Sequence, residues 1–85
     1  MEKHYSYVLE SLKDNRLYYG MTNNPDLRLK QHNDGRVDST KNRRPLRLVG
    51  YEEHPTKEAA LSRERYYKSC RNKNYILSLF KNSLS

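Results

Sequence analysis

Residues 5–32 of this 85-residue chain read YSYVLESLKDNRLYYGMTNNPDLRLKQH, and we predict the rest of the fold outward from this stretch. From Tyr5 to Glu10, Tyr and Leu side chains alternate with Ser, Val and Glu, a period of two that is typical of a β-strand. The Lys-Asp-Asn sequence at 13–15 favours a turn, and residues 17–22 predict a second strand. The two strands should pair as an antiparallel hairpin, in which Gly20 would let another group approach the backbone closely.

The sequence Asn-Pro-Asp at 24–26 indicates the start of a helix. Asn caps helices well, Pro suits the first helical position, and an acidic residue favours the positive end of the helix dipole. The helix should run to about Asn33 and stop at Gly35. Residues 33–45 show no clear period, and a loop of this length in a small domain is usually functional or disordered.

The second half of the chain predicts one more strand and two more helices. The strand covers 46–52, and a helix capped by Thr56 runs to about Ser69. A last helix covers 74–82, and its expected apolar face consists of Tyr75, Ile76, Leu79 and Phe80. The order β-β-α-β-α-α indicates an α+β fold, and we expect residues 1–85 to form a single domain.

The amino-acid composition favours some classes of binding partner over others. A formal charge of +7 and a pI near 9.7 favour a polyanion, most commonly nucleic acid. Mean hydropathy is −1.19, but nine aromatic residues argue for a folded core over disorder. The sequence has no strong basic amphipathic helix of the kind that binds a membrane surface. It also has no apolar run typical of a signal peptide or long enough for a membrane span. Cys70 is the single cysteine, so we expect a cytoplasmic protein without an internal disulfide.

Five residues could carry chemistry. Glu64 is predicted on the helix face that meets the sheet, where it could bind a hard cation or simply pair with Lys68 one turn later. Arg28 and His32 share one face of a helix and could clamp a phosphate and move a proton, or could form a solvated basic surface. Tyrosines at positions such as Tyr7 and Tyr18 are more often core aromatics than catalysts. They become candidates for a general base where nearby cations or a metal-bound water lower the pKa of the tyrosine hydroxyl.

The order of these residues resembles that of the GIY-YIG nuclease family. Tyr7-Val8-Leu9 stands for the first motif and Tyr18-Tyr19-Gly20 for the second, and the likeness extends over residues 5 to about 80. The chain looks most like the small stand-alone members, akin to the N-terminal domain of the nucleotide-excision-repair incision subunit. Two departures stand out: the first motif lacks its glycine and isoleucine, and the late asparagine has three candidates, Asn72, Asn74 and Asn82.

The resemblance implies a three-stranded antiparallel sheet flanked by helices, and hydrolysis of a DNA phosphodiester with one divalent metal, Mg²⁺ or Mn²⁺. Glu64 would hold the metal, Arg28 would stabilise charge on the phosphate, and His32 would assist beside it. Tyr18 or Tyr7 would activate or position the attacking water. Such chemistry needs a nucleophile, charge neutralisation and a metal at the phosphate oxygens.

The densest basic cluster is expected to bind DNA phosphates beside this site, and it consists of Lys41, Arg43, Arg44 and Arg47. Lys68, from a second basic cluster, is expected to assist. No major-groove reading helix is evident, so selection should follow DNA structure or be weak. A protein partner or a homodimer could supply specificity, and a role in DNA repair would fit. Two other functions stay open: a nucleic-acid-binding module without catalysis, and a protein-interaction adaptor.

Overall fold

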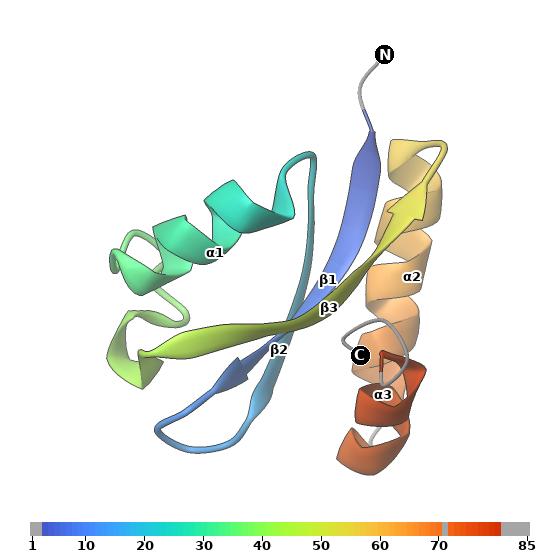
Figure 1. Cartoon of the computed structure of the whole chain (residues 1–85). Coiled ribbons are helices and arrows are strands. Elements are labelled where there is room, and N and C mark those ends of the chain that lie inside the picture. Colours follow the sequence, from blue (N-terminus) through green and yellow to red (C-terminus); the bar gives the residue numbers. More distant parts are fainter. Residues whose placement is uncertain (1–2, 71, 81–85) are drawn as a thin grey trace.

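The computed structural model describes residues 3–70 and 72–80 and contains a three-stranded sheet with helices on both faces (Figure 1). The elements in chain order are β1 (His4–Ser11), β2 (Leu17–Thr22), α1 (Pro25–Asn33), a 3₁₀ turn (Lys41–Arg43), β3 (Leu46–His54), α2 (Lys57–Ser69) and α3 (Lys73–Leu79). The predicted α+β class and the order β-β-α-β-α-α are confirmed.

All strand pairs are antiparallel, and the strand order β2-β1-β3 places β1 in the centre. Tyr7 lies opposite Gly20 of β2 and opposite Tyr51 of β3. Successive side chains of a strand point to opposite faces. Tyr7 contacts His32 of α1, whereas Ser6 contacts Tyr67 of α2. The first and second helices therefore cover opposite faces of the sheet, as Figure 1 also shows.

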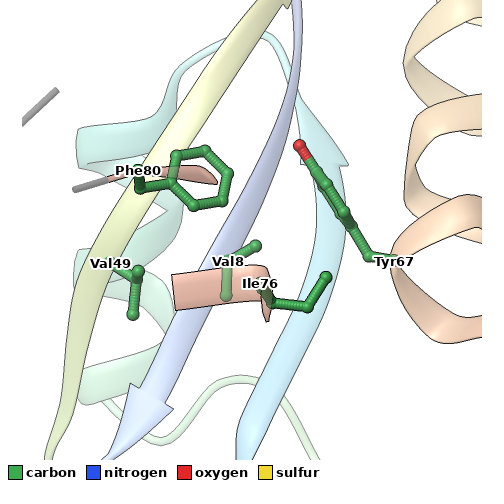
Figure 2. Close-up of a cluster of buried hydrophobic side chains, with 5 residues drawn as sticks. All are labelled: Val8, Val49, Tyr67, Ile76 and Phe80. Atoms are coloured by element: carbon green, nitrogen blue, oxygen red, sulfur yellow. The ribbon is translucent and has the colours of Figure 1, made fainter. Parts of the chain in front are cut away.

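Each face has its own cluster of buried side chains. The larger cluster lies under α2 and α3 and comprises Val8, Val49, Tyr67, Ile76 and Phe80 (Figure 2). The smaller cluster lies on the α1 side and comprises Tyr7, Leu9 and Leu46, with Tyr18, Leu29 and Leu48 packed against it. Consecutive residues of β1 thus supply both clusters, which makes this strand the common wall of the core.

The predicted helix starts and stops are confirmed in their local geometry. Asn24 accepts a hydrogen bond from the Leu27 backbone N–H at 3.1 Å, and Thr56 caps α2 in the same way through Ala59 at 3.1 Å. Beyond the end of α1, Gly35 has φ +81°, the left-handed conformation that glycine adopts at little cost.

Two details differ from the predictions. β3 continues to His54, because its full length pairs with β1. Tyr75 does not join the apolar face of α3: it is exposed, and its hydroxyl lies 2.6 Å from that of Tyr66. The last helix is described to Leu79, and its predicted end at residue 82 lies outside the described residues. Over the described ranges, no helix has the length and apolar character needed to cross a membrane.

Candidate active site

A chain of hydrogen bonds runs from the central strand through α1 into the following loop. The Tyr7 hydroxyl lies 3.1 Å from His32 Nε2, and His32 Nδ1 lies 2.7 Å from Thr40 Oγ1. All three side chains are buried. Within α1, Leu29 packs against the smaller cluster, and His32 is the residue whose side chain is buried.

The contacts of Thr40 favour one direction for these hydrogen bonds. Thr40 Oγ1 lies 3.5 Å from the Val37 carbonyl oxygen, which can only accept a hydrogen bond. A Thr40 hydroxyl that donates to Val37 accepts from the Nδ1–H of His32. His32 Nε2 is then left with a free lone pair, which accepts the hydroxyl proton of Tyr7.

His32 is neutral in this environment. Burial and, to a smaller degree, the positive charge of Arg28 together lower the pKa of His32 from its ordinary value of 6.5 to about 4. A neutral imidazole is what the Tyr7 hydroxyl needs as an acceptor. The site thus holds Tyr7 by an oriented base rather than by a second cation.

Arg28 reaches the same hydroxyl from the preceding turn of α1. Its Nε donates to the Tyr7 oxygen at 3.4 Å, and one terminal nitrogen donates to Gln31 Oε1 at 3.1 Å. The guanidinium has no carboxylate partner among the described residues, so its charge is available to an anion. The predicted grouping of Arg28 and His32 on one helix face, next to a tyrosine, is present in the structure.

Gly20 makes room for this arrangement. It lies opposite Tyr7, and a Cβ atom at this position would be 2.5 Å from the Tyr7 hydroxyl oxygen. That distance is far inside van der Waals contact, so any side chain at position 20 would displace the hydroxyl. The close approach predicted from a glycine within a strand is therefore made by Tyr7 itself.

Tyr18 lies on the same face as Tyr7 but has a different environment. It faces Leu9 across the ladder, packs against the smaller cluster, and lies 6.0 Å below the guanidinium of Arg43. Its hydroxyl makes no hydrogen bond to another residue in the described parts of the chain. Of the two tyrosines, Tyr7 is the one linked to both Arg28 and His32.

Glu64 lies on α2, the helix on the other face of the sheet. Its side chain is only 15% exposed, in agreement with the predicted inward position, and it forms an ion pair with Lys68 at 3.8 Å. Within residues 3–70 and 72–80, it makes no hydrogen bond or ion pair to Tyr7, Arg28 or His32. The structure is therefore compatible with both interpretations of Glu64, as a partner of Lys68 and as a ligand of a cation. The ion pair exists but is long, and the carboxylate is sheltered from solvent.

The family model of the GIY-YIG catalytic domain matches residues 3–76 of this chain. The chain belongs to the GIY-YIG family. Among similar proteins, a UPF0213 protein of Bacillus licheniformis is 46% identical over 72 residues, which cover 84% of this chain and 73% of that protein. The UPF0213 protein YazA of Bacillus subtilis is 42% identical over 71 residues, covering 82% and 71%.

A solved structure supports the same assignment. The solution NMR structure of the UPF0213 protein BH0048 from Bacillus halodurans matches with a TM-score of 0.56 and 38% identity. The match covers 93% of this chain and 85% of that chain. The names of these relatives state no activity, so a nuclease assignment rests on the catalytic-domain match. The likeness to the excision-repair subunit stays a prediction.

GIY-YIG nucleases are generally dependent on a divalent metal, and Glu64 is chemically suited to one. Mg²⁺ is often held by one or two carboxylates plus substrate phosphates and water. The described residues contain no group of three or more His, Cys, Asp or Glu side chains able to hold a metal. Glu64 is a sheltered carboxylate whose Oε1 takes no part in the Lys68 ion pair, so it fits a metal that takes its other ligands from DNA and water.

The predicted phosphate-tracking residues differ in how much of their charge is free. Arg43 forms an ion pair with Asp14, and Arg47 forms one with Glu10 at 2.8 Å. These two arginines hold the hairpin and β3 together. Among the described residues, the ion pair of Lys41 is a 3.8 Å contact with the exposed Asp38, and the Arg44 guanidinium donates only to carbonyl oxygens. Lys68 is the partner of Glu64.

The sequence reasoning missed the residues that support His32 and the junction after it. Thr40 lies in a loop without a period, and its only signal was that this loop is too long to be a plain connection. Asn33 binds the backbone of Leu46 twice, as acceptor at 2.8 Å and as donor at 2.9 Å. Among the asparagines considered, Asn72 caps α3 through the Tyr75 N–H, and Asn74 is exposed. Asn82 lies outside the described residues.

Proposed function

We propose that this protein is a metal-dependent DNA endonuclease that hydrolyses one phosphodiester and selects its target by DNA structure or only weakly. The observation that carries the proposal is the contact between Tyr7 and neutral His32, with Arg28 on the same hydroxyl. A module that only stacks bases or binds phosphates has no need of a tyrosine hydroxyl held between a base and a cation.

Tyr7 is the group that would activate water. The attacking water forms a bond to phosphorus, the bond to the leaving oxygen breaks, and the proton of the water passes to the Tyr7 oxygen. The hydroxyl proton of Tyr7 passes to His32 Nε2 at the same time, because this nitrogen lies within hydrogen-bond distance of the hydroxyl, at 3.1 Å. The leaving oxygen takes a proton from solvent.

DNA binding itself would make this transfer easier. The charge of Arg28 is one of the two causes of the low pKa of His32. A phosphate paired with Arg28 offsets that charge, so the pKa of His32 rises towards its ordinary value when substrate is bound. His32 would therefore become a better proton acceptor in the complex than in the free protein.

Arg28 and Glu64 would share the work of charge stabilisation. Arg28 would bind the phosphate oxygens, where negative charge develops in the transition state. Glu64 would hold the divalent metal, which would supply charge neutralisation to the bound DNA from the α2 side of the sheet. Lys41 and Arg44 would bind flanking phosphates, with Lys68, Arg43 and Arg47 contributing to the field of the surface.

The test is a cleavage assay on labelled forked, flap, single-stranded and duplex DNA, with Mg²⁺ or Mn²⁺ and with EDTA. Parent, Tyr7→Phe and Glu64→Gln run side by side with Tyr51→Phe, a matched control. Tyr51 is the neighbour of Tyr7 on β3, is 48% exposed and makes no hydrogen bond through its hydroxyl to a described residue. We expect metal-dependent cleavage by the parent and the control, and a loss of at least about 100-fold in the two site variants.

Two results would count against the proposal. Equal cleavage by Tyr7→Phe and Tyr51→Phe would remove Tyr7 from the reaction, and undiminished cleavage by Glu64→Gln would remove the metal ligand. Salt-sensitive binding without cleavage on every substrate would instead support the non-catalytic binding module.

A further inference from the structure

A basic cavity lies beside the loop that follows α1. Its volume is about 530 Å³, and it is lined by Lys13, Asn33, Lys41, Asn42, Arg44 and Pro45. Three of these six side chains are cationic, two are amides, and none is a carboxylate. Such a lining suits an anion that carries several acceptor oxygens.

The cations keep their charge at this position. Lys13 Nζ donates to the Asn42 carbonyl at 3.0 Å, and Arg44 Nε donates to the Lys41 carbonyl at 2.7 Å. A carbonyl orients a cation without neutralising it. Lys41 has a 3.8 Å contact with Asp38, whose side chain is 97% exposed, and an ion pair that is so open to water is weak. The neighbouring Arg43, in contrast, is paired with Asp14.

The backbone is shaped to accommodate the arginine. Gly35 has φ +81°, and a Cβ atom there would lie 2.9 Å from a terminal nitrogen of Arg44. The same guanidinium nitrogen is 3.5 Å from the Asn33 carbonyl oxygen. The absence of a side chain at position 35 thus lets the guanidinium lie against the end of α1.

The cavity is built from the same short segments as the candidate active site. Lys41 directly follows Thr40, which binds His32, and Asn33 directly follows His32. The Asn33 side chain is fixed by two hydrogen bonds to the Leu46 backbone. The cavity therefore stands at a constant distance from Tyr7 and His32.

We propose that the cavity formed by Lys13, Lys41 and Arg44 is an anion subsite for one backbone phosphate of bound DNA, at a fixed number of nucleotides from the scissile bond. The inference rests on the proposed function for its choice of ligand, because it takes DNA as the polyanion. A backbone phosphate suits this open lining, in which five of the six described residues carry a cationic or amide side chain. Under this proposal, Lys13 in the β1–β2 turn contacts the DNA backbone.

The experiment replaces one phosphate at a time in a forked DNA by a neutral methylphosphonate and measures binding by fluorescence anisotropy in EDTA, which prevents cleavage. The parent is compared with Lys13→Gln/Arg44→Gln and with Lys57→Gln/Arg65→Gln, which removes the same charge from exposed side chains of α2. We expect one position, away from the scissile phosphate, to cost the parent and the control about tenfold in affinity. The cavity variant should show no further loss at that position.

The salt dependence of binding gives a second readout on unmodified DNA. The slope of log K against log [salt] should fall by about 0.9 in the cavity variant, if one duplex phosphate contact is lost, and less in the control. Circular dichroism establishes that both variants are folded.

The outcomes separate the two proposals. A position-specific loss that vanishes only in the cavity variant supports the subsite, even where no substrate is cleaved. An equal small loss at every position, or a loss that persists in the cavity variant, overturns the subsite and leaves the nuclease assignment intact. A parent protein that does not bind DNA at low salt also overturns it.

Discussion

Gly20 and the Tyr7 hydroxyl face each other across the β1–β2 ladder, and the space between them has no room for a methyl group. We predict that Gly20→Ala displaces the hydroxyl from His32 and Arg28 and abolishes most cleavage. Overpacking should also cost about 1–3 kcal/mol in the free energy of unfolding. Cleavage rates at saturating protein, together with urea unfolding, measure the two effects.

Gly50 offers a matched control on the opposite face. A Cβ atom at Gly50 would lie 2.3 Å from a ring carbon of Phe80, so Gly50→Ala should destabilise the protein to a similar degree. The added methyl group would point to the cluster under α2 and α3, on the face of the sheet opposite to the Tyr7 side chain. If the two variants lose cleavage equally at a temperature where both are folded, the steric account of Gly20 is wrong.

The histidine makes stability depend on pH in a predictable direction. His32 has a pKa of about 4 in the folded protein and about 6.5 when unfolded, so between these values the unfolded state binds more protons. Stability should therefore fall as pH falls from 6.5 towards 4, by up to about 1.4 kcal/mol per pH unit from this group. Urea unfolding of the parent and of His32→Gln at pH 7.5, 6.5, 5.5 and 5.0 measures it.

The variant should be less stable than the parent at pH 7.5, because it loses the buried hydrogen bonds, but its free energy of unfolding should change less between pH 6.5 and 5.0. This pH window avoids most carboxylate titration. The pKa of Glu10 is lowered by its hydrogen bond to Lys73. Burial opposes the shift at Glu52, but the pKa of this carboxyl is lowered by its hydrogen bond to Tyr67. Identical pH slopes in the two proteins would contradict the assignment of a buried neutral imidazole.

Sequence patterns located the chemistry of the site better than its supports. Arg28 and His32 could be paired by their spacing of four on a helix. The choice between Tyr7 and Tyr18 could not be made, because it depends on which hydroxyl meets His32 in three dimensions. Thr40 escaped prediction for the same reason: its role arises from the return of an irregular loop to the end of α1.

At the level of elements, the junction between α1 and β3 holds the site together. Asn33 ends the helix and forms a two-point amide contact with the first residue of the strand, Leu46. Asn33→Ala should leave both backbone groups of Leu46 without this partner and cost about 1–3 kcal/mol. Asn33→Asp, which keeps the acceptor for the Leu46 N–H, should cost less, and Asn23→Ala, at an exposed position before α1, should cost little. Thermal and urea unfolding measure all three, and an Asn33→Ala variant as stable as Asn23→Ala would contradict the role of this contact.

Elements with strong local signals were predictable, and their surroundings were not. The caps of α1 and α2 follow from Asn24 and Thr56, whose side chains act within three residues. The period of two in β1 predicted a strand but not that both of its faces are covered, since that depends on helices arriving from distant parts of the chain. Tyr75 matched the apolar stripe of α3, yet it lies at the exposed margin, where its hydroxyl can pair with that of Tyr66.

On the scale of the whole molecule, the two clusters share β1, so we predict that they unfold together as one cooperative unit. Ile76 is fully buried under the sheet face opposite to Tyr7. Ile76→Ala should remove about 2–5 kcal/mol from the global free energy of unfolding by leaving a cavity. Amide hydrogen exchange should then accelerate to a similar extent at His32 in α1 and at Phe80 after α3, since both amides would open through global unfolding. Leu27→Ala, at a side chain that is 50% exposed, is the control and should change neither rate appreciably. Acceleration confined to α3 would show that the helix opens alone, and that the predicted single domain consists of two units of different stability.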